Sequence, residues 1–225
     1  MAFEAITPKV FQVAGPEMTD PRDCCVYLAD VGVPVLIDTG AGPSYHTIRR
    51  AIAETGLPWS DPHTIILTHC HIDHMGSALR FKQDCGARIV AHARDADAVE
   101  QGDPERTAAG WYGLDAPATP VDVRLTDTCT LEFPNGRLVC VHTPGHTPGS
   151  ISVLFDTPEG LVLFGQDIHG PFSPIFGSSL SQWADSMRLL LGYNADILCE
   201  GHFGVIRPAG QVRRYIERYL EHHGY

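Results

Sequence analysis

Histidine and aspartate are concentrated in one short segment of this sequence. Residues 68–74 read Thr-His-Cys-His-Ile-Asp-His, so three imidazoles and a carboxylate lie within six positions. His69 and His71 are two residues apart, and in an extended chain their side chains point to the same side and can reach one metal ion. If the backbone turns after His71, Asp73 and His74 can face a second metal ion. Imidazole and carboxylate are typical zinc ligands, and such sites also take iron or manganese.

The segment that precedes this histidine cluster supports the same interpretation. His63–Thr68 is a short apolar run of the kind that forms a buried strand. Sheets in α/β proteins place their sites at the carboxyl ends of strands, where the cluster would lie. A run of surface histidines is the alternative, but chance does not commonly place this spacing after a buried strand. Cys70 alternates away from its two histidine neighbours, so we expect it to be a packed structural residue.

Apolar runs of strand length alternate with periodic segments of helix length along the whole chain. The expected strands are Phe11–Ala14, Cys24–Ala29, Val33–Ile37, His63–Thr68, Arg88–Ala91, Val123–Leu125, Thr128–Phe133, Arg137–His142, Ser150–Phe155, Leu161–Phe164 and Ile197–Glu200. The expected helices are Tyr45–Glu54, a segment after the histidine cluster through Lys82, Arg94 to Glu100, Leu180–Leu191 and Ala209–His223. Residues 101–121 and 170–179 are expected to be loops.

Each half of the chain therefore has strands first and then a helix–strand–helix segment. This order predicts an α/β fold in which helices cover the outer faces of the sheets, as in an αββα sandwich. No Pro- or Gly-rich linker divides the sequence, so we expect a single domain over residues 1–225.

Composition narrows the range of partners. The chain has 16 Lys and Arg against 27 Asp and Glu, a net charge of −11, which argues against nucleic acid because phosphate backbones are bound by clustered basic residues. No apolar run approaches the roughly 20 residues that span a bilayer, so no membrane partner is expected. The seven cysteines are odd in number and scattered, which fits reduced thiols in a cytoplasmic protein.

The histidine cluster and three later motifs resemble the metallo-β-lactamase superfamily, whose signature is His-x-His-x-Asp-His. The later motifs come in the order of that family: the Thr-Pro-Gly-His loop at 143–146, Phe-Gly-Gln-Asp at 164–167 and Gly-His at 201–202. The resemblance covers residues 11–202 and implies an αββα sandwich of two mixed sheets. By the same resemblance, one metal would be held by His69, His71 and His146. A second metal would be held by Asp73, His74 and His202, with Asp167 between the two.

The resemblance also implies a chemistry, that of a metal-dependent hydrolase. Two metal ions, expected to be Zn²⁺, would lower the pKa of a shared water and hold a metal-bound hydroxide that attacks a small thioester, ester or lactone. Asp73 is the expected catalytic residue, since it could orient the hydroxide and pass a proton to the leaving group. The expected partner is therefore a small-molecule substrate.

Within the superfamily the motifs are most similar to the glyoxalase II-like group, which hydrolyses glutathione thioesters. Those enzymes add a C-terminal helical domain with basic residues that hold glutathione, whereas this sequence ends at Tyr225, shortly after His202. We therefore expect another thioester or ester as substrate. His71 stands where flavodiiron proteins carry glutamate, and Asp167 where one β-lactamase subclass carries cysteine, so both of these activities are disfavoured. The RNA-processing nucleases share the ligands but are disfavoured by the negative charge.

Two alternative functions stay open. Persulfide dioxygenases, which are also glyoxalase II-like and use one iron ion, resemble this chain at His69, at or near His71, at His146 and at Asp167. A non-catalytic metal-binding protein is the second alternative. The complete second set of ligands favours hydrolysis over both.

Three further residues are candidates for the surroundings of the site. Asp38 ends a strand at the same sheet edge and either orients a ligating histidine or belongs to an Asp-Thr-Gly turn. Tyr112, with its neighbour Trp111, either lines the substrate pocket or anchors the loop at 101–121. His169 follows Asp167 by two positions, where lactonases of the superfamily often have a nearby tyrosine.

The substrate is expected to be selected by the loops at 101–121 and 170–180, neither of which carries a motif. Apolar side chains around the second loop form either a pocket rim or a surface buried against a second subunit: Phe172, Ile175, Phe176 and Trp183. A homodimer is expected only because it is the commonest assembly. The adjacent Cys24 and Cys25 are expected to be packed, with redox activity as the alternative.

Overall fold

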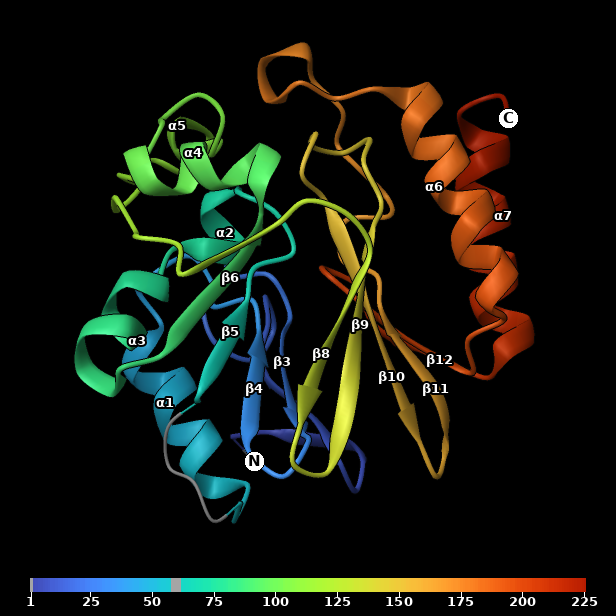
Figure 1. The fold of residues 1–225 in the computed structure, drawn as a ribbon. Coiled ribbons are helices and arrows are strands. Elements are labelled where there is room, and N and C mark those ends of the chain that lie inside the picture. The colour runs from blue at the N-terminus through green and yellow to red at the C-terminus, as the bar shows by residue number, and fades with distance from the viewer. Residues whose placement is uncertain (1, 58–61) are drawn as a thin grey trace.

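Two β-sheets stack face to face and carry helices on both outer sides (Figure 1). The computed structural model describes residues 2–57 and 62–225. Helices α1 to α5 lie on the side of the first sheet, and α6 and α7 cover the second. The αββα sandwich predicted from the sequence is therefore confirmed.

The first sheet contains seven strands in chain order, from β1 to β7. The strands β1 to β4 pair antiparallel and β4 to β7 pair parallel. Their bounds are Glu4–Thr7, Val10–Ala14, Val26–Asp30, Pro34–Ile37, Thr64–Ile66, Arg88–His92 and Val123–Leu125. The central strands β4 and β5 are buried along their whole length, which explains why they read as continuous apolar runs.

The second sheet contains six strands in the order β13-β12-β11-β10-β9-β8. Only β11 and β12 pair parallel; the other neighbours are antiparallel. In chain order from β8 to β13 the bounds are Cys129–Phe133, Gly136–His142, Ile151–Thr157, Gly160–Phe164, Ile197–Glu200 and Gly204–Ile206.

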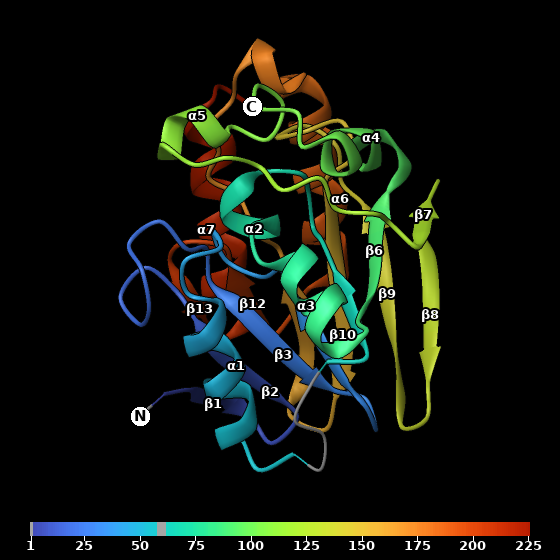
Figure 2. The same ribbon diagram turned by 90° about the vertical axis from the view of Figure 1, so that its left-hand side faces the viewer.

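The helices divide into two groups, one on each outer face, as the turned view shows for the first sheet (Figure 2). In chain order from α1 to α7 they are Tyr45–Glu54, Ile72–Met75, Ala78–Cys85, Ala93–Gln101, Ala109–Tyr112, Leu180–Tyr193 and Ala209–His222, and a 3₁₀ turn, η1, spans Pro174–Phe176. Three apolar layers result: one between each sheet and its helices, and one between the sheets. None of the helices in the described ranges combines the length and apolar composition needed to cross a bilayer.

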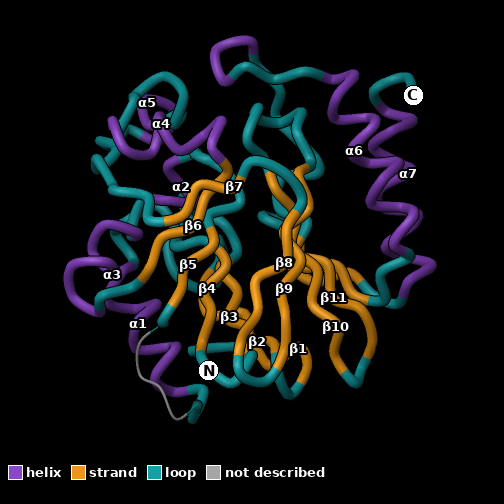
Figure 3. The backbone as a smooth tube through the Cα atoms, in the orientation of Figure 1, coloured by secondary structure: helices purple, strands orange, loops and turns teal. Residues whose placement is uncertain are grey.

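The loops that matter for function gather at one end of the sandwich (Figure 3). Four connections meet there: those that follow β5, β9, β11 and β12. The histidine cluster follows β5, and the other three motifs follow β9, β11 and β12. The fold thus brings segments from both sheets to one place.

Several local expectations differ from the structure. The helix expected through Lys82 is two helices, α2 and α3, separated at Gly76, where a Cβ atom would lie 2.3 Å from the backbone of Ala41. The expected loop at 101–121 contains the short helix α5, and the loop at 170–179 contains η1. Strands β1 and β13 were not predicted, since both are short outer strands that pair on one side only.

Candidate metal centre

The histidine cluster adopts the turn that two metal sites require. His71 is extended, with φ −67° and ψ 147°, and the single-turn helix α2 starts at the next residue. His69 and His71 therefore precede the turn, while Asp73 and His74 lie within it. All four side chains are buried.

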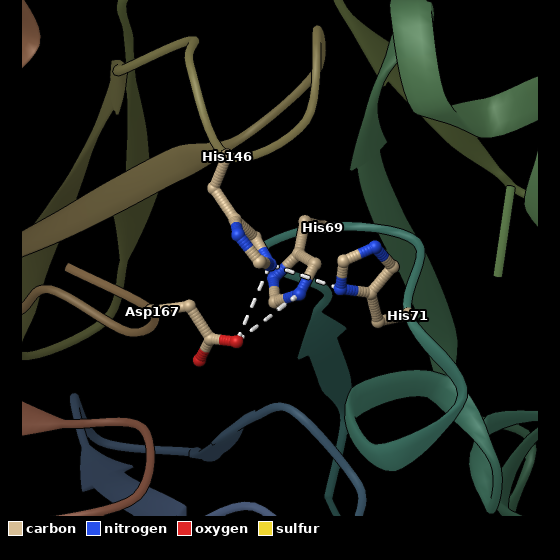
Figure 4. Close-up of side chains that lie close together, drawn as sticks. All are labelled: His69, His71, His146 and Asp167. Carbon is tan, nitrogen blue, oxygen red and sulfur yellow. Dashed lines mark hydrogen bonds and ion pairs between the residues drawn. The ribbon is translucent and has the colours of Figure 1, made fainter. Parts of the chain in front are cut away.

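The first ligand group consists of four buried side chains: His69, His71, His146 and Asp167. Figure 4 shows the three imidazoles and the carboxylate turned toward a common point. His146 Nε2 lies 2.9 Å from His71 Nδ1 and 3.3 Å from Asp167 Oδ2. His69 Nε2 lies 3.8 Å from the same carboxylate oxygen. Four donor atoms at these separations can share one metal ion.

The second ligand group consists of Asp73, His74 and His202. His202 Nε2 lies 3.2 Å from Asp73 Oδ2, and His74 Nε2 lies 3.4 Å from that oxygen. Both imidazoles also face Asp167 Oδ1, at 3.4 Å and 3.2 Å respectively. Asp167 therefore presents Oδ2 to the first group and Oδ1 to the second.

Unpaired buried atoms show that these residues fit a metal. Burying a polar atom without a hydrogen bond is costly, so native proteins avoid it. Within the described part of the chain, no hydrogen-bond partner satisfies several atoms that face the two groups: His69 Nε2, His74 Nε2, Asp73 Oδ1 and Oδ2, and Asp167 Oδ1. Coordination to metal ions would satisfy such atoms.

Protonation states of the first group also suit a metal. Burial lowers the pKa of His71 to about 3, with a further contribution from the neighbouring His146. Burial likewise lowers the pKa of His69 and of His146. Neutral imidazoles keep the nitrogen lone pair that a metal ligand needs.

The second group combines ionised carboxylates with basic imidazoles. Burial acts to raise the pKa of Asp73 and Asp167, but the nearby His74 and His202 outweigh it and hold both values low. Burial acts in the opposite sense on His202, and there Asp167 and Asp73 outweigh it and raise the pKa to about 10. A metal ion bound at this group would therefore displace a proton from His202.

Asp38 contacts the second group directly. It follows β4 with a positive φ of 61°, and its Oδ2 lies 2.7 Å from His74 Nδ1. Its carboxylate also accepts hydrogen bonds from the backbone N–H and the hydroxyl of Thr68 and from Gln166 Nε2. A carboxylate on Nδ1 leaves the Nε2 lone pair for a metal, so the structure places Asp38 where it can orient His74.

Asp95, which the sequence did not single out, ties the two loops of the first group together. Its fully buried carboxylate accepts from Cys70 N at 3.1 Å, Thr147 Oγ1 at 2.6 Å and Gly149 N at 2.8 Å. Cys70 lies between His69 and His71, and Thr147 follows the third histidine. In the sequence Asp95 reads only as an acidic residue in the first turn of a helix, so no local pattern identifies it.

His169 and Tyr112 both lie near the second group. His169 Nδ1 is 2.8 Å from Glu200 Oε1, and its ring centroid is 5.2 Å from that of His202. The buried Glu200 also accepts from the backbone N–H of His202, which fixes the turn that carries this ligand. Tyr112 packs against the core beneath the helices of the first sheet; burial raises its pKa, and the nearby Asp73 adds to the rise.

Two further observations complete the surroundings. Cys70 is buried as expected, with its thiol donating to the carbonyl of Arg106 at 3.3 Å. A groove of about 570 Å³ lies beside His202 and is lined by polar as well as apolar side chains, including Glu4, Gln12, Glu17, Met18 and Phe203.

Comparison with known proteins agrees with this geometry. The chain is 29% identical to hydroxyacylglutathione hydrolase GloC of Haemophilus influenzae, over 86% of this chain and 90% of that protein. It is 27% identical to the uncharacterized protein YobT of Bacillus subtilis, over 86% of this chain and 89% of that protein. The structure of a metallo-beta-lactamase from Cronobacter sakazakii superposes with a TM-score of 0.84 at 20% identity, covering 99% of this chain and 93% of that one, which shows a shared fold.

The family model of the metallo-beta-lactamase superfamily matches residues 20–202, which include all seven side chains of the two ligand groups. The relatives include hydroxyacylglutathione hydrolases, which fits the glyoxalase II-like group. By its sequence, its fold and its His/Asp cluster, this chain belongs to the metallo-β-lactamase superfamily and is a metallo-hydrolase.

Proposed function

We propose that this chain uses a dinuclear zinc centre to hydrolyse a small thioester, ester or lactone. The observation that carries the proposal is the position of Asp167, whose two oxygens face different ligand groups. A carboxylate in this position can bridge two metal ions, and paired metals recur in hydrolases. The identity with hydroxyacylglutathione hydrolases supports thioesters and esters as the substrate class.

Zinc suits these ligands better than calcium or magnesium. Five of the seven donor side chains are imidazoles, whereas calcium and magnesium prefer oxygen ligands. Iron and manganese also bind imidazole and carboxylate, but sites of this kind bind zinc more tightly than either.

Metal ions bound here would lower the pKa of a water toward neutrality and polarise the carbonyl of the substrate. The protein's own residues prepare the site for that reaction. Asp38 accepts from His74 Nδ1 and so keeps this imidazole directed at the second group. Asp73 Oδ2 lies toward His74 and His202, while Oδ1 has no hydrogen-bond partner in the described residues. Oδ1 is therefore the atom that can hold the proton of the attacking water and deliver it to the leaving group.

A persulfide dioxygenase with one iron ion is the rival proposal, and it needs only the first ligand group. The second group is equally well assembled, because Asp73 and His74 are buried and His202 is fixed by Glu200. The three donor side chains of this group lie within reach of one another, and some of their buried atoms have no hydrogen-bond partner among the described residues. Both observations support the binding of a second metal ion over a purely structural role for these residues.

Hydrolysis by matched variants tests the proposal. The zinc-loaded protein is assayed against small thioesters, aryl esters and lactones, alongside His202→Ala and the control His222→Ala, whose imidazole lies on the exposed side of α7. We expect the control to match the wild type and His202→Ala to lose a factor of about 100 or more in kcat/KM. Hydrolysis of none of these substrates by the wild type, together with O₂ uptake on a persulfide, would support the rival.

A further inference from the structure

Two segments without charged residues flank the first ligand group. Residues 107–114, which include α5, and residues 170–184, which include η1, contain no Asp, Glu, Lys or Arg, although the chain has 27 acidic and 16 basic residues. Figures 1 and 2 place α5 and the connection before α6 at the same end of the molecule as α2, which carries Asp73 and His74. A charged ligand would find no opposite charge on either segment.

Aromatic contacts connect these segments to a metal-ligand side chain. The ring of Phe176 lies 4.5 Å from that of His71 and 4.8 Å from that of Trp111, measured between centroids. Phe176 is buried, whereas Trp111 is 61% exposed and Ile175 is 55% exposed. The rings of Phe176 and Trp111 therefore form a continuous apolar path from His71 to the surface, and the exposed Ile175 is the neighbour of Phe176 in η1; these three residues are called the apolar wall.

Exposed apolar side chains that lie next to a site, rather than scattered singly over the surface, can form part of a binding surface. A second subunit is one candidate for covering the wall, but the ring contact of Phe176 connects the wall to His71, a side chain of the first ligand group. Ligand pockets combine apolar walls with a few polar groups that fix the reacting atoms, and here the wall adjoins the ligand groups. The contact with His71 therefore favours the substrate as the occupant.

The two sides of the centre differ in polarity, which orients the substrate. The groove beside His202 carries Glu4, Gln12 and Glu17 together with apolar side chains such as Met18 and Phe203, whereas the wall carries no charged residue. Asp73, the proposed proton carrier to the leaving group, belongs to the second ligand group on that side. The leaving alcohol or thiol then lies toward the polar groove, and the acyl group lies toward the wall.

We propose that the substrate carries an uncharged apolar acyl chain that lies along the wall of Trp111, Ile175 and Phe176. This inference rests on the proposed hydrolase function and specifies its substrate class. It predicts that each added methylene contributes binding until the wall is covered, by roughly two- to fourfold in kcat/KM. A carboxylate at the end of the chain would lose its hydration without gaining a partner, and so would be rejected.

The test compares acyl chains of two, four, six and eight carbons as p-nitrophenyl esters, with the monoester of adipic acid as the charged six-carbon chain. The variants are Trp111→Ala and the control Leu189→Ala, which removes a 46% exposed apolar side chain near the other end of α6. We expect kcat/KM to rise with chain length in the wild type and the control, and to rise much less in Trp111→Ala. The adipate ester should react at least roughly tenfold more slowly than the hexanoate ester.

An equal chain-length dependence in Trp111→Ala and wild type, or a preference for the adipate ester, would overturn the inference while leaving the hydrolase function intact. If the wild type cleaves none of the esters, the proposed function fails. A binding measurement then tests the apolar wall independently of hydrolysis. Octanoate should then change the tryptophan emission of the wild type and leave that of Trp111→Phe unchanged, because only the wild type has an indole at this position. An equal change of emission in the wild type and in Trp111→Phe would show that octanoate does not bind at the apolar wall.

Discussion

Asp95 and Thr147 form a buried hydrogen bond of 2.6 Å that joins helix α4 to the loop of His146. The same carboxylate accepts from Gly149 N in that loop and from Cys70 N in the histidine cluster. Gly149 leaves room for this approach, since a Cβ atom there would lie 2.6 Å from the Asp95 carboxylate. A single side chain thus sets the spacing between the loops that carry the three histidines of the first ligand group.

Replacing Asp95 with asparagine should weaken the first metal site selectively. The amide has one oxygen in place of two and points N–H groups at the donors of Thr147 or Gly149. We expect a loss of about 1–3 kcal/mol in unfolding free energy and a drop of roughly tenfold or more in the affinity of one metal ion. Titration of the metal-free protein against a chromophoric zinc chelator resolves the two affinities.

The control for this prediction is Asp97→Asn on the same helix, where an exposed carboxylate pairs with Arg124 at 2.8 Å. Exposed pairs contribute little, so this variant should bind both ions as the wild type does. If Asp95→Asn also bound both ions with unchanged affinities, Asp95 would have no role in positioning the first group.

Asp38→Asn should weaken the second metal site. The change keeps the size of the side chain but removes the negative charge that faces His74 Nδ1 at 2.7 Å. Loss of such a partner typically lowers metal affinity by about 10- to 100-fold. The same chelator titration measures the effect, with Asp156→Asn on an exposed position of β10 as the control. A weakened first site beside an intact second site would contradict the role assigned to Asp38.

Metal binding at the second group should release protons and tighten as the pH rises. Asp167 and Asp73, acting against burial, raise the pKa of His202 to about 10, so its imidazole holds a proton at neutral pH that the metal must displace. Affinity should therefore increase from pH 6 to pH 9. Calorimetric zinc titrations in buffers of different ionisation enthalpy give the number of protons released on binding. We expect about one proton or more to be released when the second zinc ion binds. Release of none would contradict the raised pKa and show that His202 is already neutral in the metal-free protein.

Removing the metals should destabilise the fold, because the buried donors then lose their partners. A ligand at a free concentration about 1,000 times its dissociation constant stabilises the native state by about 4 kcal/mol per site. Urea unfolding with zinc and with chelator should differ by at least that amount for the wild type and by less for His202→Ala. Equal differences in the two proteins would argue against a second ion.

The sequence predicted the central strands well and the outer ones poorly. Strands β4 and β5 are buried on both faces, so burial alone makes them continuous apolar runs such as Val35-Leu36-Ile37. Strand β1 has two exposed residues among four and pairs only with β2, and β13 begins at a glycine with positive φ. Such strands depend on their neighbours rather than on their own composition.

The candidate site shows the same division between local and distant signals. The residues of the histidine cluster lie close together in the chain, so their spacing alone predicted metal binding. The distant ligands His146, Asp167 and His202 followed from the resemblance to a family, because spacing carries no information over such separations. Asp95 and Glu200 gave no signal, since each is a single carboxylate whose partners are defined by the fold, Thr147 lying 52 positions from Asp95.

The central claim, two ions bridged by Asp167, is tested most directly by the metal content of the chain purified without chelator or metal-binding tag. We expect about two zinc ions per chain in the wild type and about one in His202→Ala, since on this proposal each ligand group would hold one ion. One iron ion per chain in both proteins would contradict the dinuclear centre and favour the mononuclear oxygenase.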